Sequence, residues 1–193
     1  MRIIGIWGIV LLQFVSGNLS AQKEKQHYEI NKDKSYVKWS SMDGETEYAG
    51  SFKLKSGYID MEGQELKLMT IFVDTKSFTC QKCGDPTQSK LIVNFVNSPQ
   101  FLNSGQMDYA SFKMFENKML EKGLYHIKGQ LSMIGYSNDV EFDANVQIKK
   151  EKLASEAEFT INRDQWELRN PDDGRPSHPS SIITLSIHIE SKD

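Results

Sequence analysis

The chain has 193 residues, a length typical of one globular domain, and 38% of them are hydrophobic. Its 23 Lys and Arg residues against 26 Asp and Glu residues give a formal net charge of −3. A mildly acidic chain without a block of basic residues lacks the positively charged surface that binding of nucleic acid requires. The composition therefore predicts a single folded domain and excludes nucleic acid as a partner.

The first 21 residues have the order of a secretory signal peptide. Arg2 precedes an apolar run over residues 3–15, and small and polar residues follow up to Ala21. The apolar run is shorter than the roughly 20 residues that a membrane-spanning helix needs. We therefore predict a signal peptide over residues 1–21, a mature domain over residues 22–193, and a periplasmic or secreted bacterial protein.

The first part of the mature chain alternates as β-strands do. Residues 35–41 and 48–55 alternate apolar and polar side chains around an Asp43-Gly44 turn, and a Ser56-Gly57 break precedes the next short strand. Residues 65–75 are apolar on both faces. That strand is therefore expected to need a cover on its outer side.

A short amphipathic helix is expected to provide this cover. Asp85 is a favourable N-cap, Pro86 suits the first helical position, and Gln88 follows three residues after the cap. Apolar residues then recur at helical spacing up to Val96, and Pro99 ends the pattern.

The longest alternating pattern lies over residues 125–148. Tyr125 to Met133 and Val140 to Ile148 each place apolar residues on one face, and residues 135–139 between them are typical of a turn. The pattern predicts a long antiparallel hairpin with one apolar face, which the rest of the chain must cover.

The remaining segments complete an all-β pattern. Residues 109–115, 153–161 and 183–189 alternate, and residues 170–181 contain three prolines and are expected to form a loop. Seven to nine strands with one or two short helices predict an all-β sandwich or barrel. Small residues such as Gly129 and Ala144 on the apolar face would leave room inside a barrel for a ligand.

Four short segments stand out in chain order: residues 50–52 (GSF), 73–78 (VDTKSF), 127–135 (IKGQLSMIG) and 159–166 (FTINRDQW). Their succession, over about residues 28–189, resembles the YceI-like family of bacterial periplasmic lipid-binding proteins. It implies an extended, antiparallel, lipocalin-like β-barrel of about eight strands. It also implies an apolar tunnel that holds an isoprenoid chain, either a polyprenyl lipid or an isoprenoid quinone, and transient contact with a membrane.

We predict that inward-facing apolar side chains line this tunnel. They are Val37, Trp39, Phe52, Leu54, Ile71, Val73, Phe112, Met114, Ile127, Leu131, Val140, Phe142, Phe159 and Ile161. Sheathing a prenyl chain with such residues needs no catalytic group and no cofactor. The alternative is that these side chains fill a dry core, and that the protein acts through its surface in an envelope assembly.

The polar candidates are the cluster around Arg163 and the segment that leads into the predicted helix. Arg163 and Trp166 follow an inward-alternating strand, and they either close the barrel end or meet a lipid head group. Where family members typically carry an Arg-Asp-x-His-Leu run, residues 87–91 are TQSKL, so no head-group contact carries over from the family at this point.

Cys80 and Cys83 are the only cysteines, and they are spaced as C-x-x-C. In an exported protein we expect them to form a disulfide; a thiol-redox pair is the alternative. Metal ligands at zinc spacing and a catalytic triad are absent from the sequence pattern, which favours a binding protein over an enzyme.

Overall fold

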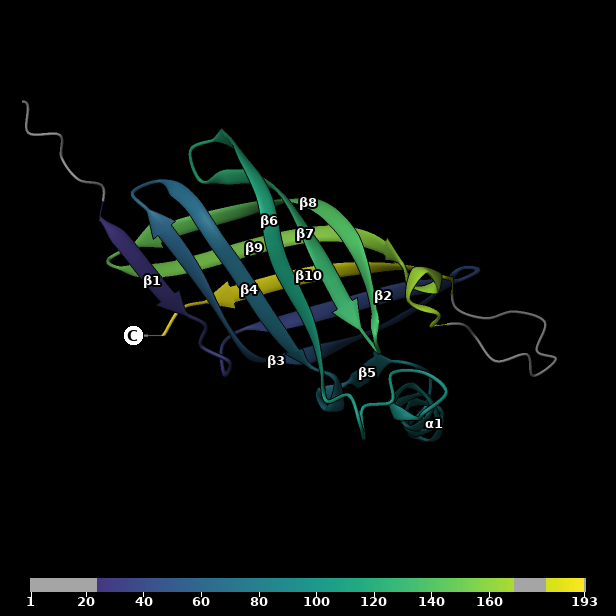
Figure 1. Cartoon of the computed structure of the whole chain (residues 1–193). Coiled ribbons are helices and arrows are strands. Elements are labelled where there is room, and N and C mark those ends of the chain that lie inside the picture. Colours follow the sequence, from purple (N-terminus) through teal and green to yellow (C-terminus); the bar gives the residue numbers. More distant parts are fainter. Residues whose placement is uncertain (1–23, 169–179, 193) are drawn as a thin grey trace, which may run out of the picture.

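The computed structural model describes residues 24–168 and 180–192, in which ten strands form one antiparallel sheet (Figure 1). The strands are β1 (Lys25–Glu29), β2 (Tyr36–Asp43), β3 (Thr46–Glu62), β4 (Glu65–Asp74), β5 (Thr79–Lys82), β6 (Tyr109–Glu121), β7 (Leu124–Met133), β8 (Tyr136–Lys149), β9 (Lys152–Asn162) and β10 (Ile182–Glu190). The helical elements are α1 (Pro86–Asn97) and two short 3-10 helices, η1 (Thr75–Ser77) and η2 (Arg163–Trp166). The predicted signal peptide and most of the predicted loop over residues 170–181 lie outside the described residues.

The sheet closes on itself as a barrel of eight strands. Its order is β3-β2-β10-β9-β8-β7-β6-β4, and β4 pairs back onto β3. Closure depends on the 17 residues of β3, because its first half pairs with β2 and its second half pairs with β4. β1 and β5 add to opposite ends of β3. The all-β barrel that the sequence predicts is confirmed.

Two β-bulges explain where the predictions for β3 and β4 are wrong. The expected break at Ser56-Gly57 is a shift in register after Leu54 within one continuous strand. A second shift, between Asp60 and Met61, brings both Leu66 and Met69 to the barrel interior, where they are 3% and 2% exposed. The bulge thus accounts for Leu66, whereas Leu68 and Phe72 alternate with the buried residues and lie half-buried on the other face of β4.

Helix α1 begins and ends where the sequence predicts but has a different position. The carboxylate of Asp85 accepts hydrogen bonds from the backbone N–H groups of Thr87 and Gln88 at 2.7 and 2.9 Å. The helix packs against β5 at one end of the barrel (Figure 1), so the expectation that it covers the outside of β4 is wrong.

The hairpin of β7 and β8 has a tighter turn than predicted. Ile134 and Gly135 form it, with φ values of 46° and 87°, as a two-residue type I′ turn requires. β8 therefore starts at Tyr136, and the polar residues 137–139 belong to the strand. Asn138 is accommodated there because its side-chain amide donates to the carbonyl oxygen of Gln165 at 2.8 Å.

Candidate functional site: an apolar cavity

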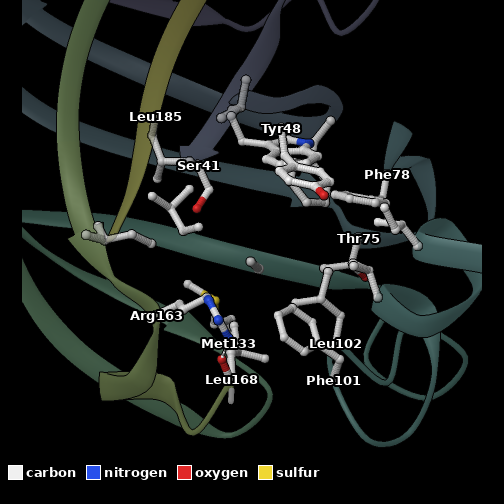
Figure 2. Close-up of a pocket in the computed structure, with 18 of the residues that line it drawn as sticks. Ser41, Tyr48, Thr75, Phe78, Phe101, Leu102, Met133, Arg163, Leu168 and Leu185 are labelled. Atoms are coloured by element: carbon white, nitrogen blue, oxygen red, sulfur yellow. Dashed lines mark hydrogen bonds between the residues drawn. The ribbon is translucent and has the colours of Figure 1, made fainter. Parts of the chain in front are cut away.

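A cavity of about 450 Å³ lies at the α1 end of the barrel (Figure 2). The barrel wall contributes Val37, Trp39, Phe52, Val73, Ala110, Leu131, Met133, Ile161, Ile183 and Leu185. α1 and the segment after it contribute Leu91, Ile92, Phe95, Val96, Phe101 and Leu102. The surface of this cavity is predominantly apolar, as in pockets that bind small hydrophobic molecules.

An aromatic group closes the cavity next to β5. The ring of Phe78 lies 5.1 Å from that of Trp39 and 5.2 Å from that of Phe52. The indole N–H of Trp39 donates to the carbonyl oxygen of Thr79 at 3.2 Å. These contacts hold the indole ring against the wall and satisfy its one polar group.

Two of the hydroxyl groups in the wall, those of Ser41 and Thr75, already donate to the protein itself. Ser41 donates to the carbonyl oxygen of Ser180 at 3.0 Å, and Thr75 donates to that of Met107 at 2.7 Å. Because neither hydroxyl has its proton available to a ligand, both segments of the wall offer mainly apolar contacts. The other polar lining residues include Asp43, Tyr48 and Gln88.

Arg163 is a buried cation at one side of the cavity (Figure 2). Its guanidinium donates to the carbonyl oxygens of Leu168 and Ser180, and it lies 5.7 Å from the ring centre of Phe101. Burial lowers the pKa of Arg163, and the carboxylate of Asp164 acts in the opposite direction. These bonds hold Arg163 at the corner that η2 forms. Because its side chain also lines the cavity, closing the barrel end and meeting a head group both stay predictions.

Trp166 also closes this end of the barrel. Its side chain is 0% exposed, does not line the cavity, and donates from its indole N–H to the carbonyl oxygen of Leu131 at 2.9 Å. Trp166 therefore packs within the barrel end, and its contact with a head group stays a prediction.

The predicted lining residues fall into two groups. Six of them line the cavity: Val37, Trp39, Phe52, Val73, Leu131 and Ile161. The other eight face the interior but do not line it: Leu54, Ile71, Phe112, Met114, Ile127, Val140, Phe142 and Phe159. Within this second group, the rings of Phe112, Phe142 and Phe159 pack against one another, and a tunnel that extends past them stays a prediction.

The contribution of α1 and the segment after it to the cavity wall was not predicted from the sequence. Ile92, Phe95 and Leu102 face the cavity, although the apolar face of the helix was expected to cover β4. Ile183 and Leu185 also line the cavity, and their alternation on β10 was a usable signal. The position of α1 had no such local signal.

Cys80 of β5 and Cys83, in the segment between β5 and α1, form a disulfide with their Cα atoms 5.7 Å apart. Cys83 is 1% exposed and Cys80 is half-buried. Within the described residues, no group of three or more His, Cys, Asp or Glu side chains could hold a metal ion. None of the helices described is both long and apolar enough to span a membrane.

Comparison with solved structures gives the same fold. BcnA of Burkholderia cenocepacia is 16% identical, with a TM-score of 0.62 over 84% of this chain and 99% of its own. The YCEI protein of Campylobacter jejuni is also 16% identical, with a TM-score of 0.53 over 100% of this chain and 99% of its own. A search of curated proteins finds no match. The family model for the YceI-like domain matches residues 28–191, and the chain belongs to this family.

Proposed function

We propose that the protein binds one isoprenoid chain in its cavity and either sequesters or carries that lipid. The observation that carries the proposal is an apolar cavity of about 450 Å³ whose Ser41 and Thr75 hydroxyls are already engaged. A cavity of about 150 Å³ holds benzene, so this one has space for about 18 carbon atoms. Membership of the YceI-like family supports a prenyl chain over other apolar ligands.

The polar end of the lipid lies at the rim in this proposal. Asp43, Tyr48 and Gln88 are the polar residues of the β2–β3 hairpin and of α1 that line the cavity. Leu91 also lines it and is 63% exposed, so the rim offers an apolar residue for transient contact with a membrane during loading. Polyprenyl lipids and isoprenoid quinones both have the required form, a long apolar chain with one polar end.

Binding alone is sufficient for this function, and we propose no catalytic step and no cofactor. Burial of apolar surface provides the driving force, at about 25 cal/mol per Å² before the costs of ordering are subtracted. The disulfide and the N-terminal sequence pattern support a periplasmic or secreted location.

The test is to identify the lipid that the protein retains. Protein made in a bacterial host is purified without detergent, extracted with organic solvent, and analysed by mass spectrometry. Ala110→Trp fills the cavity, whereas Ala154→Trp adds the same side chain at an exposed position of β9 and is the matched control.

We expect a prenyl lipid in the wild type and the control, and at least a tenfold lower amount in Ala110→Trp. A folded wild-type protein that retains no lipid and takes up none from vesicles would contradict the proposal. That result would favour the alternative of a protein that acts through its surface.

A further inference from the structure

Three phenylalanines form the floor of the cavity. On β6, Ala110 lines the cavity, whereas Phe112, the next inward-facing residue, does not. On β9, Ile161 lines the cavity, whereas Phe159, the next inward-facing residue, does not. The ring of Phe142, from β8, is stacked on that of Phe159 with centroids 4.3 Å apart. The ring of Phe112 lies 5.3 Å from that of Phe142. We call Phe112, Phe142 and Phe159 the aromatic floor.

A glycine opposite the floor makes the closure tight. A Cβ atom at Gly129 would lie 2.3 Å from Cζ of Phe112, so the phenyl ring occupies the space that a side chain on β7 would need. Phe112 and Phe142 are 7% and 6% exposed, and Phe159 is half-buried. The small residue at this position therefore admits a ring of the protein itself, contrary to the expectation that it leaves room for a ligand.

The barrel remains filled beyond the floor. Ile127, two residues beyond Gly129 on β7, is 0% exposed, and Tyr125 after it is 2% exposed. Neither residue lines the cavity. A chain that enters beside α1 therefore meets the aromatic floor.

We propose that the aromatic floor sets the length of isoprenoid chain that the protein shelters, at about 18 carbon atoms, or three to four isoprene units. A longer chain leaves its remainder outside the cavity, where it gains no affinity. This inference rests on the proposed function, since it concerns the depth of the same site.

The experiment is a competition between prenols of different lengths. Geraniol, farnesol, geranylgeraniol and a 25-carbon prenol are offered together at equal, low concentrations in buffer without a competing membrane, and native mass spectrometry measures which of them the folded protein has taken up. At typical ligand efficiency, each five-carbon unit inside the cavity raises affinity about tenfold. We expect occupancy to rise up to farnesol or geranylgeraniol and to be level beyond that length.

Three variants test the floor itself. Phe142→Ala removes six ring carbons and should extend the rise by about one isoprene unit. Phe115→Ala is the matched control, because it removes the same ring from β6 at a position that is 59% exposed and does not line the cavity, and it should leave the limiting length unchanged. Ala110→Leu adds three carbons just above the floor and should shorten the limiting length, so the test does not depend on the folding of one variant.

The outcomes separate this inference from the proposed function. Uptake of prenols with a limit that shifts in Phe142→Ala or in Ala110→Leu supports the floor as the determinant of length. Uptake that keeps rising to the 25-carbon prenol, or a limit that all variants share, overturns the floor and leaves lipid binding intact. A wild type that takes up none of the prenols overturns the proposed function and this inference with it.

Discussion

The two halves of the barrel are built from the same strands but are filled differently. On β7, Ile127 is 0% exposed in the packed half, whereas Leu131, four residues later on the same face, lines the cavity. An eight-stranded barrel has an interior that side chains can just fill or that holds one small ligand. In this protein buried side chains such as Ile127 and Tyr125 fill one half behind the aromatic floor, and the other half is hollow next to α1. The comparison shows that an inward-facing residue either packs in the core or lines the cavity according to its depth.

The largest expected effect separates the two halves by stability. Ile127→Ala should lower the free energy of unfolding by about 4 kcal/mol, because it leaves a new cavity in close packing. Leu185→Ala should cost about 1 to 2 kcal/mol, since that side chain already borders empty space. Urea denaturation of both variants measures the difference. Equal losses would mean that the hollow half is packed as densely as the other.

Removal of the disulfide should weaken only the hollow end. The bond closes a loop of four residues, for which chain entropy predicts a stabilisation of about 2 kcal/mol. In the double variant Cys80→Ser/Cys83→Ser, amide hydrogen exchange should become faster in β5 and α1 and remain unchanged near Ile127. Faster exchange throughout the barrel would show that the two halves unfold as one unit.

Loss of the helix cap should have a smaller effect at the same end. Asp85→Ala leaves two N–H groups of α1 without their side-chain acceptor, and it should lower the free energy of unfolding by about 1 kcal/mol. Because α1 lines the cavity, the variant should also release a bound prenol faster. Asp85→Asn, which can still accept these hydrogen bonds, is the control. Release rates that do not change would mean that α1 does not limit exit of the ligand.

The smallest expected effect depends on pH. Lys55, at the bulge of β3, donates to the carboxylate of Asp108 at 2.6 Å and thereby lowers the pKa of Asp108. A carboxylate whose pKa is lower in the folded state stabilises the fold above its unfolded pKa of about 3.9 and loses this effect as the pH falls through its folded pKa.

Asp108→Asn should therefore be slightly less stable than the wild type at pH 7, and the difference should diminish below about pH 4 and in high salt. Urea denaturation at several pH values measures it. A difference that stays constant across this range would show that the pair of Lys55 and Asp108 does not contribute through charge.

The strands and the helix were predictable because their signals are local. Alternation identified the inner face of β7 from Tyr125 to Leu131, and Asp85 with Pro86 located the start of α1. Depth along the barrel was not predictable, because it depends on register between strands that are distant in sequence. Phe142 and Leu131 have the same pattern in the sequence, yet one belongs to the floor and the other to the wall.

The β-bulges could not be predicted for the same reason, since they also depend on the register between strands. Nothing in the residues around Leu54 distinguishes a bulge from a break, and only the pairing of β3 with both β2 and β4 decides it. The two-residue turn at Ile134-Gly135 was not predicted, because the polar residues 137–139 that follow it suggested a longer loop. The packing of α1 against β5 likewise depends on contacts between elements that alternation and capping do not encode.

The most direct test of the account is to locate a bound chain by methyl NMR. Geranylgeraniol is titrated into protein labelled at its Ile, Leu and Val methyl groups. We expect chemical-shift changes at Leu131, Ile161 and Leu185, which line the cavity. We expect none in the packed half at Ile59, Ile127 and Ile189, which are 0%, 0% and 2% exposed. Changes centred on the packed half, or no changes in the cavity wall, would contradict it.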